Sequence, residues 1–122
     1  MTTIVLWVSD INRQANFYSA LLDAPIKSES EEFCEVGNER NSVLLHLLPE
    51  QFRVQAGSLV PVQEEVAIKP VFTVVSIEAA TARTASQKIR ITGEVKTYGE
   101  VSYLDCIDPE GNVIQISEAT SN

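Results

Sequence analysis

The chain contains little cysteine, one histidine and few basic residues, and each shortage excludes a class of protein. Cys34 and Cys106 are too few for a disulfide scaffold, and we expect both to be reduced thiols. Nine basic residues against 17 acidic ones leave a net charge of −8, which argues against binding to nucleic-acid phosphates. No apolar run reaches the roughly 18 residues that a membrane span needs.

The first ten residues, MTTIVLWVSD, lack the basic start and the small-residue cleavage site of a secretory signal. We therefore expect a cytoplasmic protein with no membrane and no nucleic-acid partner. With 44% hydrophobic and 21% charged residues, the composition is that of a globular protein. The length predicts a single domain over residues 1–122 that is large enough to bury a core of its own.

The sequence contains an internal repeat with an offset of 66 residues. Residues 4–11, IVLWVSDI, and residues 70–77, PVFTVVSI, share one pattern. In each, a β-rich run is followed by a small polar residue and by an isoleucine that begins a helical periodicity. The repeat therefore predicts two halves that each begin with a strand followed by a helix.

The first helix is predicted to begin after Ser9 or Asp10, either of which can cap it, and to end before Pro25. Its apolar residues recur on one helical face: Ile11, Ala15, Tyr18, Leu21 and Leu22. The second helix begins after Ser76 and is rich in alanine and threonine. Its weaker face is marked by Ile77, Ala80, Thr84 and Lys88.

After each helix the apolar period changes to two, which is typical of strands. The predicted strands cover residues 33–36, 42–48, 94–97, 101–107 and 113–117. Residues 108–112, DPEGN, predict a tight turn, and residues 49–65 break the period and connect half-modules of about 1–50 and 66–122. The predicted class is α+β, with two sheets that curve around a cleft and with the helices outside.

Two stretches of the chain resemble motifs of the vicinal oxygen chelate superfamily. Residues 8–11, VSDI, together with residues 16–18, NFY, and 21–22, LL, resemble its opening motif, and residues 108–116, DPEGNVIQI, resemble its closing motif. The superfamily includes glyoxalase I, extradiol dioxygenases, fosfomycin-resistance enzymes and bleomycin-binding resistance proteins. The resemblance implies two paired βαβββ modules that form a curved mixed sheet around a cleft, and a homodimer. It implies no single activity, because this fold hosts enzymes of several kinds and plain binding proteins.

The superfamily's enzymes hold a divalent metal with His, Glu or Gln side chains on three or four strands. The resemblance places these positions at Thr3, Lys69 and Gln115, with a fourth at Leu45 or His46. Threonine is a poor ligand for such a metal, and a lysine ammonium repels a cation. One histidine and one glutamine fall short of the three protein ligands that such metals need. We therefore expect neither a metal nor another cofactor.

If Thr3 and Lys69 face the cleft, the alternation of side chains along each strand assigns the remaining positions. An apolar wall with a few convergent polar groups is typical of a small-molecule site, and here it predicts an apolar or aromatic ligand. The predicted ligand-binding residues are Trp7, His46, Lys69, Thr73, Tyr103, Asp105 and Gln115.

Several of these residues also have simpler interpretations. His46 is a candidate acid or base, but a lone histidine on a strand is more often hydrogen-bonded within the protein. Trp7 also suits the core or a subunit interface, and Lys69 can extend into solvent beside Pro70. Lys69 and Asp105 would form an ion pair if the fold brings them together.

Three functions from different classes follow from these residues. The first, which we favour, is a metal-free small-molecule-binding protein similar in kind to the bleomycin-binding members. The second is a metal-dependent lyase or oxygenase of the glyoxalase or dioxygenase type, with His46 and Gln115 among its ligands. The third is a metal-free enzyme in which His46 is the acid or base and Lys69 holds an anionic or carbonyl substrate.

Overall fold

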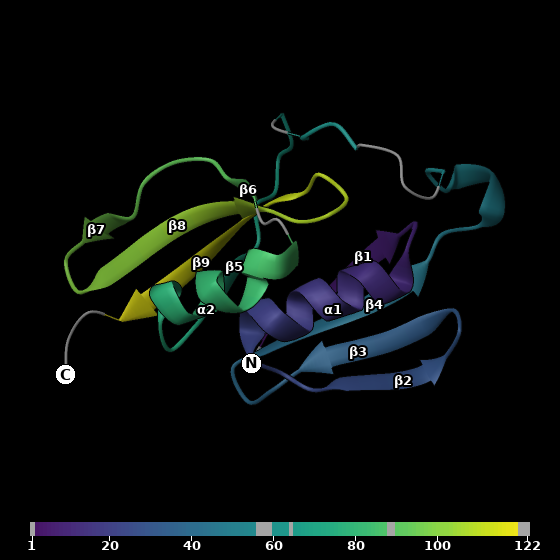
Figure 1. Cartoon of the computed structure of the whole chain (residues 1–122), viewed down its shortest axis with the longest axis horizontal. Helices are drawn as coiled ribbons and strands as arrows, with labels where there is room; N and C mark the ends of the chain where they lie inside the picture. Colours follow the sequence, from purple (N-terminus) through teal and green to yellow (C-terminus); the bar gives the residue numbers. More distant parts are fainter. Residues whose placement is uncertain (1, 56–59, 64, 88–89, 120–122) are drawn as a thin grey trace.

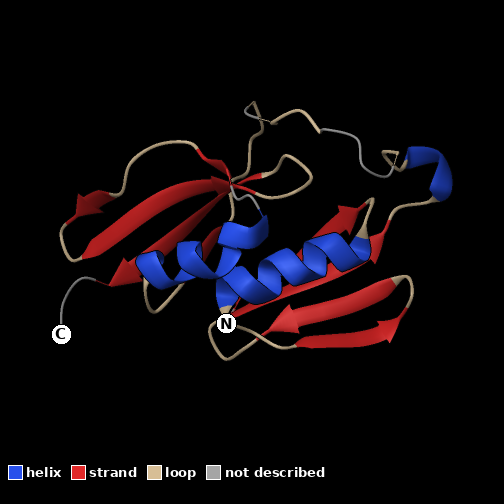
Figure 2. Cartoon of the chain, viewed as in Figure 1, coloured by secondary structure: helices blue, strands red, loops and turns tan. Residues whose placement is uncertain are grey.

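The computed structural model describes residues 2–55, 60–63, 65–87 and 90–119 (Figures 1 and 2). The first half of this part of the chain contains β1 (Thr2–Val8), α1 (Ile11–Leu22), β2 (Ile26–Ser30), β3 (Phe33–Gly37), β4 (Asn41–Leu47) and the short 3₁₀ helix η1 (Glu50–Phe52). The second half contains β5 (Val71–Thr73), α2 (Ile77–Thr84), the 3₁₀ helix η2 (Ala85–Gln87), β6 (Arg90–Ile91), β7 (Lys96–Tyr98), β8 (Val101–Ile107) and β9 (Val113–Ala119).

Each half builds one mixed sheet, and the two sheets have the same strand order. The first sheet runs β1-β4-β3-β2, and the second runs β5-β9-β8-β6, with β7 also paired to β8. The first strand of each half lies parallel to the last strand of that half, and the other neighbours are antiparallel. This shared order confirms the α+β class and the two repeated halves that the sequence predicted.

The helix α1 begins and ends where its sequence provides caps. The side chain of Asp10 accepts the backbone N–H of Arg13 at 3.0 Å, so Asp10 rather than Ser9 is the cap. Asp23 ends the helix in the left-handed conformation, with φ of 52°. Neither described α-helix is long and apolar enough to cross a membrane.

The helix α2 is shorter than its apolar pattern predicts. Ser76 caps it by accepting the N–H of Ala79 at 3.0 Å, as expected. At its other end, the Thr84 hydroxyl donates to the carbonyls of Ala80 and Thr81, both at 3.1 Å. Because these carbonyls are shared with a side chain, the last turn tightens into η2. Lys88, predicted to continue the face, lies outside the described residues.

Both helices lie on the same side of the sheets and pack against each other (Figure 1). The guanidinium of Arg83 in α2 donates to the carbonyls of Ala20 and Leu21 at the end of α1, at 2.6 and 3.1 Å. Between helices and sheets lies a core whose largest buried side chains include Phe17, Tyr18, Leu21, Leu45, Phe72, Ile114 and Ile116. This packing leaves the opposite face of each sheet open for a site.

A buried carboxylate joins α1 to the turn between β8 and β9. Asp108 Oδ2 accepts hydrogen bonds from Gln14 Nε2 at 3.0 Å, from the Tyr18 hydroxyl at 2.8 Å and from Asn112 Nδ2 at 2.9 Å. Its Oδ1 accepts the backbone N–H groups of Glu110 and Asn112, at 2.9 and 3.0 Å. One side chain therefore fixes the turn and docks it on the helix of the other half.

Two further polar contacts connect the halves. The Glu110 carboxylate accepts the backbone N–H groups of Ser9, at 2.8 and 2.9 Å, and of Asp10, at 3.0 Å. The Asn41 side chain accepts the backbone N–H of Thr73 at 3.1 Å and donates to the Thr73 carbonyl at 2.7 Å. The two sheets thus meet at the start of β4 and the end of β5.

Three segments differ from the predicted strands. The strand β2 was not predicted, because all its side chains are exposed and its sequence, IKSES, has no apolar alternation. The strand expected at 94–97 is β7, shifted to Lys96–Tyr98, and the two-residue β6 is too short for a periodic signal. The predicted connection 49–65 contains η1, and Gln63 pairs with Asn112, while residues 56–59 and 64 lie outside the described residues.

Candidate functional site

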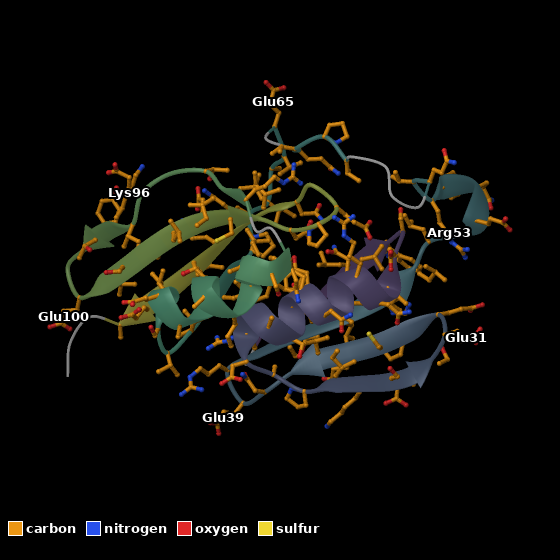
Figure 3. The ribbon with its side chains drawn as sticks, in the orientation of Figure 1. Glu31, Glu39, Arg53, Glu65, Lys96 and Glu100 are labelled. Atoms are coloured by element: carbon orange, nitrogen blue, oxygen red, sulfur yellow. The ribbon has the colours of Figure 1, made fainter. Side chains whose placement is uncertain are left out.

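A pocket of about 620 Å³ lies on the open face of the second sheet. This volume is in the range of small-molecule sites. Its lining comes from the segment before β5, the loop between β6 and β7, and strands β5, β7, β8 and β9. The lining residues are Lys69, Val71, Thr92, Gly93, Glu94, Lys96, Tyr98, Tyr103, Asp105 and Gln115. Figure 3 shows Lys96 at the edge of this sheet, on β7.

The strand register explains why residues distant in sequence meet in this pocket. Gln115 of β9 is paired with Val71 of β5 on one side and with Asp105 of β8 on the other. Directly paired residues face the same side of a sheet, so the three side chains form one row across three strands. Tyr103 lies two residues before Asp105 on the same face, and its partner on β7 is Lys96.

The pocket lining contains an ion pair, Lys69 with Asp105, that is supported by the amide of Gln115. Lys69 Nζ lies 3.0 Å from Asp105 Oδ2, and Gln115 Nε2 donates to Asp105 Oδ1 at 3.0 Å. Partial burial raises the pKa of Asp105, but the hydrogen bond from Gln115 and the contact with Lys69 outweigh it and bring the pKa below its ordinary value. Asp105 therefore stays ionised and holds the lysine ammonium over the sheet.

An aromatic wall stands beside this ion pair. The rings of Tyr98 and Tyr103 have centroids 6.1 Å apart and planes inclined by 59°. Tyr98 is exposed and Tyr103 half-buried, so ring surface remains accessible from the pocket. The pocket thus combines a charged centre with an aromatic side.

The other predicted site residues lie outside this pocket. Trp7 and His46 are neighbours on the open face of the first sheet, with ring centroids 4.8 Å apart, and Phe33 lies 4.6 Å from His46 on its other side. Thr73 lies at the end of β5, where Asn41 binds its backbone. The structure therefore brings together Lys69, Tyr103, Asp105 and Gln115, and separately Trp7 and His46.

Sequence reasoning missed Phe33, Thr92 and Lys96 as neighbours of the predicted site residues. Phe33 begins a predicted strand, and its pairing with His46 required the order of the sheet. Lys96 could have been found from the alternation of β7, had that strand been placed opposite Tyr103. Thr92 lies in a loop and follows no periodic pattern.

Neither cysteine is an activated nucleophile. Cys34 and Cys106 are both buried free thiols. Burial raises the pKa of Cys34, and burial together with the charge of Asp105 raises the pKa of Cys106 to about 11. Both thiols are therefore protonated at neutral pH, whereas nucleophilic attack requires the thiolate.

The side chains at the superfamily's metal positions do not fit a divalent metal. Thr3 lies in β1 and His46 in β4, whereas Gln115 lies in β9 and Lys69 precedes β5. The ammonium of Lys69 is already bound to Asp105, and the Gln115 amide is oriented with its N–H toward the same carboxylate. Among the described residues, no group of three or more His, Cys, Asp or Glu side chains is arranged to hold a metal ion.

Comparison with known proteins identifies the family. A model of the Glyoxalase/Bleomycin resistance protein/Dioxygenase superfamily matches residues 1–116. A glyoxalase family protein from Bacillus cereus is similar in structure, with a TM-score of 0.73, 14% identity, and coverage of 99% of this chain and 94% of that one. No curated protein matches the chain.

Two further solved structures show the same fold. A virulence protein from Salmonella typhimurium gives a TM-score of 0.66 at 22% identity, with 98% of this chain and 95% of that one covered. The fosfomycin resistance protein FosX from Listeria monocytogenes, complexed with Mn(II) and sulfate, gives 0.69 at 15% identity, with 98% and 90% covered. The strand order, the repeated halves and the match over residues 1–116 together place the chain in the glyoxalase/bleomycin resistance protein/dioxygenase superfamily.

Proposed function

We propose that this chain is a small-molecule-binding protein whose pocket on the second sheet works without a divalent metal. The observation that carries the proposal is the braced ion pair of Lys69, Asp105 and Gln115. Two of the positions that the superfamily's enzymes use for metal ligands here carry an ammonium group and an amide, both bound to one carboxylate. At these positions the positive charge is therefore supplied by the Lys69 side chain.

The rest of the pocket supports binding of a planar or apolar molecule. The tyrosine pair and Val71 supply an aromatic and aliphatic wall, and Lys69 and Gln115 are both bound to the Asp105 carboxylate. Apolar walls with few polar groups let a ligand bury its surface while those groups fix its orientation. His46, the candidate acid or base, lies between Trp7 and Phe33 on the other sheet. That position supports binding over acid–base catalysis in this pocket.

The test is thermal unfolding of chelator-treated protein with a panel of planar aromatic compounds and a panel of divalent metals. A ligand at about 100 times its Kd adds roughly 2.7 kcal/mol of stability, which raises Tm by about 4–8 °C for a domain of this size. We expect such a shift with aromatic compounds and none with metals.

Two variants locate the binding. Tyr103→Ala should abolish the shift caused by the aromatic compound, whereas Phe52→Ala, which removes an exposed ring outside the pocket, should retain it. A shift with one particular metal would contradict the proposal and favour the metal-dependent enzyme. No shift with any aromatic compound, or a shift unchanged in Tyr103→Ala, would also contradict it.

We further propose that the chain forms a homodimer in which Trp7 lies in the contact. Trp7 is 59% exposed on the open face of the first sheet, beside the exposed Val5. An indole left in water is unfavourable, and a two-fold pairing of identical surfaces buries it on both copies. Burial in such a contact explains why the first strand carries large apolar residues on both of its faces.

Sedimentation velocity at micromolar concentration tests this assembly. We expect a dimer for the unchanged chain and a monomer for Trp7→Glu. Val75→Glu serves as the control, since Val75 is also an exposed apolar residue but lies in the loop before α2. A monomeric unchanged chain, or a Trp7→Glu variant that remains dimeric, would show that this contact does not form.

A further inference from the structure

The two charged groups of the ion pair, Asp105 and Lys69, differ in how many of their hydrogen-bonding positions the protein uses. Both oxygens of the Asp105 carboxylate already have donors, Gln115 Nε2 on Oδ1 and Lys69 Nζ on Oδ2, each at 3.0 Å. The Lys69 ammonium carries three N–H groups, and one of them is directed to Asp105. Its side chain is 44% exposed. Each oxygen of the carboxylate thus has a donor from the protein, whereas among the described residues only Asp105 accepts a hydrogen bond from the Lys69 ammonium, which leaves donors for a ligand.

The remaining polar groups around the pocket also favour an acceptor. The hydroxyls of Thr92, Tyr98 and Tyr103 can each donate, and Lys96 adds a second ammonium at the rim. Glu94, an exposed residue of the loop between β6 and β7, is the other acidic side chain of the lining. A chain with nine basic residues and a net charge of −8 thus has two lysines in the lining of this one pocket.

The walls determine what kind of acceptor fits. Tyr98 and Tyr103 stand at an angle of 59°, so a flat ring placed against one of them meets the edge of the other. Val71 lies in the same row as Asp105 and Gln115 and offers an aliphatic surface. Tyr103 lies two residues before Asp105 on the same face of β8, so a planar ring packed against Tyr103 lies beside the ion pair.

We propose that the ligand of this pocket is a small planar aromatic carboxylate. Its ring packs against Tyr98 and Tyr103, and its carboxylate accepts a charge-assisted hydrogen bond from Lys69, which then bridges the ligand and Asp105. This inference rests on the proposed small-molecule function and adds the chemical class of the ligand. Asp105 and Gln115 are positioning residues here, because Asp105 holds the ammonium, Gln115 holds Asp105, and neither contacts the ligand.

The test compares two probes with the same ring, the anionic 2-naphthoate and the neutral 2-naphthamide, by fluorescence titration or calorimetry at low salt. We expect 2-naphthoate to bind roughly tenfold or more tightly than the amide, as one charge-assisted hydrogen bond in a partly desolvated site provides. Added salt should reduce this preference, because it screens the attraction between the 2-naphthoate carboxylate and the Lys69 ammonium.

Lysine variants assign the preference to one residue. Lys69→Met should weaken 2-naphthoate binding roughly tenfold while changing amide binding less than about twofold, and Lys69→Arg should restore the preference because it keeps the charge. Lys27→Met, in β2 of the first sheet, is the matched control and should bind as the unchanged chain does. Circular dichroism of each variant confirms that it is folded.

Each other outcome overturns the inference in a recognisable way. Equal binding of both probes, lost in Tyr103→Ala, would reject a carboxylate ligand and leave the small-molecule pocket standing. A preference for 2-naphthoate that survives Lys69→Met but disappears in Lys96→Met would show that Lys96 binds the carboxylate, and it would reject the role of Lys69. Absence of binding by both probes would also reject this ligand class, while the aromatic panel still decides the proposed function on its own.

Discussion

Replacing Asp108 with alanine is expected to lower the free energy of unfolding by about 3–5 kcal/mol. The carboxylate accepts five hydrogen bonds, from the side chains of Gln14 and Tyr18, from both the side chain and the backbone of Asn112, and from the backbone of Glu110. Each buried donor left without an acceptor costs about 1–3 kcal/mol, and local rearrangement recovers part of that loss. Urea unfolding followed by circular dichroism measures the effect.

Tyr18 shows how tightly this network is coupled. Burial, followed by the charge of Asp108 and the hydrogen bond to it, raises the pKa of Tyr18 well above its ordinary value, so the phenol stays protonated and donates. In the Asp108→Ala background that hydroxyl has lost its acceptor. Tyr18→Phe should therefore cost less stability there than in the unchanged chain.

The control for this prediction is another aspartate-to-alanine change at an exposed cap. Asp10→Ala removes the acceptor of one backbone N–H, that of Arg13, and should cost about 0.5–2 kcal/mol. If Asp108→Ala is too unstable to study, Asp108→Asn retains one acceptor oxygen and gives an intermediate loss. A loss from Asp108→Ala no greater than that from Asp10→Ala would contradict the structural role of the network.

Two adjacent residues of β5 should respond very differently to truncation. Phe72 is 2% exposed and its ring contacts that of Tyr18, with centroids 5.7 Å apart, so Phe72→Ala should cost about 3–5 kcal/mol. Val71 points to the opposite, open face, and Val71→Ala should change stability by about 0.5 kcal/mol or less. Both free energies of unfolding are measured by urea unfolding, and the two variants are fitted with the same m-value.

This pair of variants also tests the strand register. The pocket exists because Val71, Gln115 and Asp105 share one face of the second sheet. A slip of β5 by one residue would exchange Val71 and Phe72 between core and pocket. Similar losses of stability for the two variants, or a larger loss for Val71→Ala, would therefore show that Val71 does not share a face with Gln115 and Asp105.

Much of the fold could be predicted because periodicity records which face a side chain occupies. Alternation along β8 and β9 assigned Asp105 and Gln115 to the open face, and the repeat predicted the shared architecture of the two halves. The two capped helices followed from polar residues at their starts. The sequence was thus sufficient to predict features that depend on residues close together in the chain, namely the face of a strand side chain and the start of a helix.

The rest of the site depends on which strand lies beside which, and periodicity carries no such information. Alternation and the repeat assigned Trp7 and Lys69 to the inner faces of two different halves, but they did not show that Trp7 lies outside the pocket that Lys69 lines. The 3.0 Å contact between Lys69 and Asp105 exists because β9 lies between β5 and β8. The strand β2 was missed because it buries none of its side chains and so has no apolar signal.

The contact between Asn41 and Thr73 also bears on solubility. The strand β5 lies at the edge of its sheet. Its backbone pairs with β9, and two of these hydrogen bonds are made by the carbonyl of Pro70 and by the N–H of Val74. The N–H and carbonyl of Thr73 therefore face away from β9, where a strand of another chain could pair with them. Asn41 occupies both groups with its own amide. The Asn41 side chain thus occupies the place at which a foreign strand would pair with Thr73.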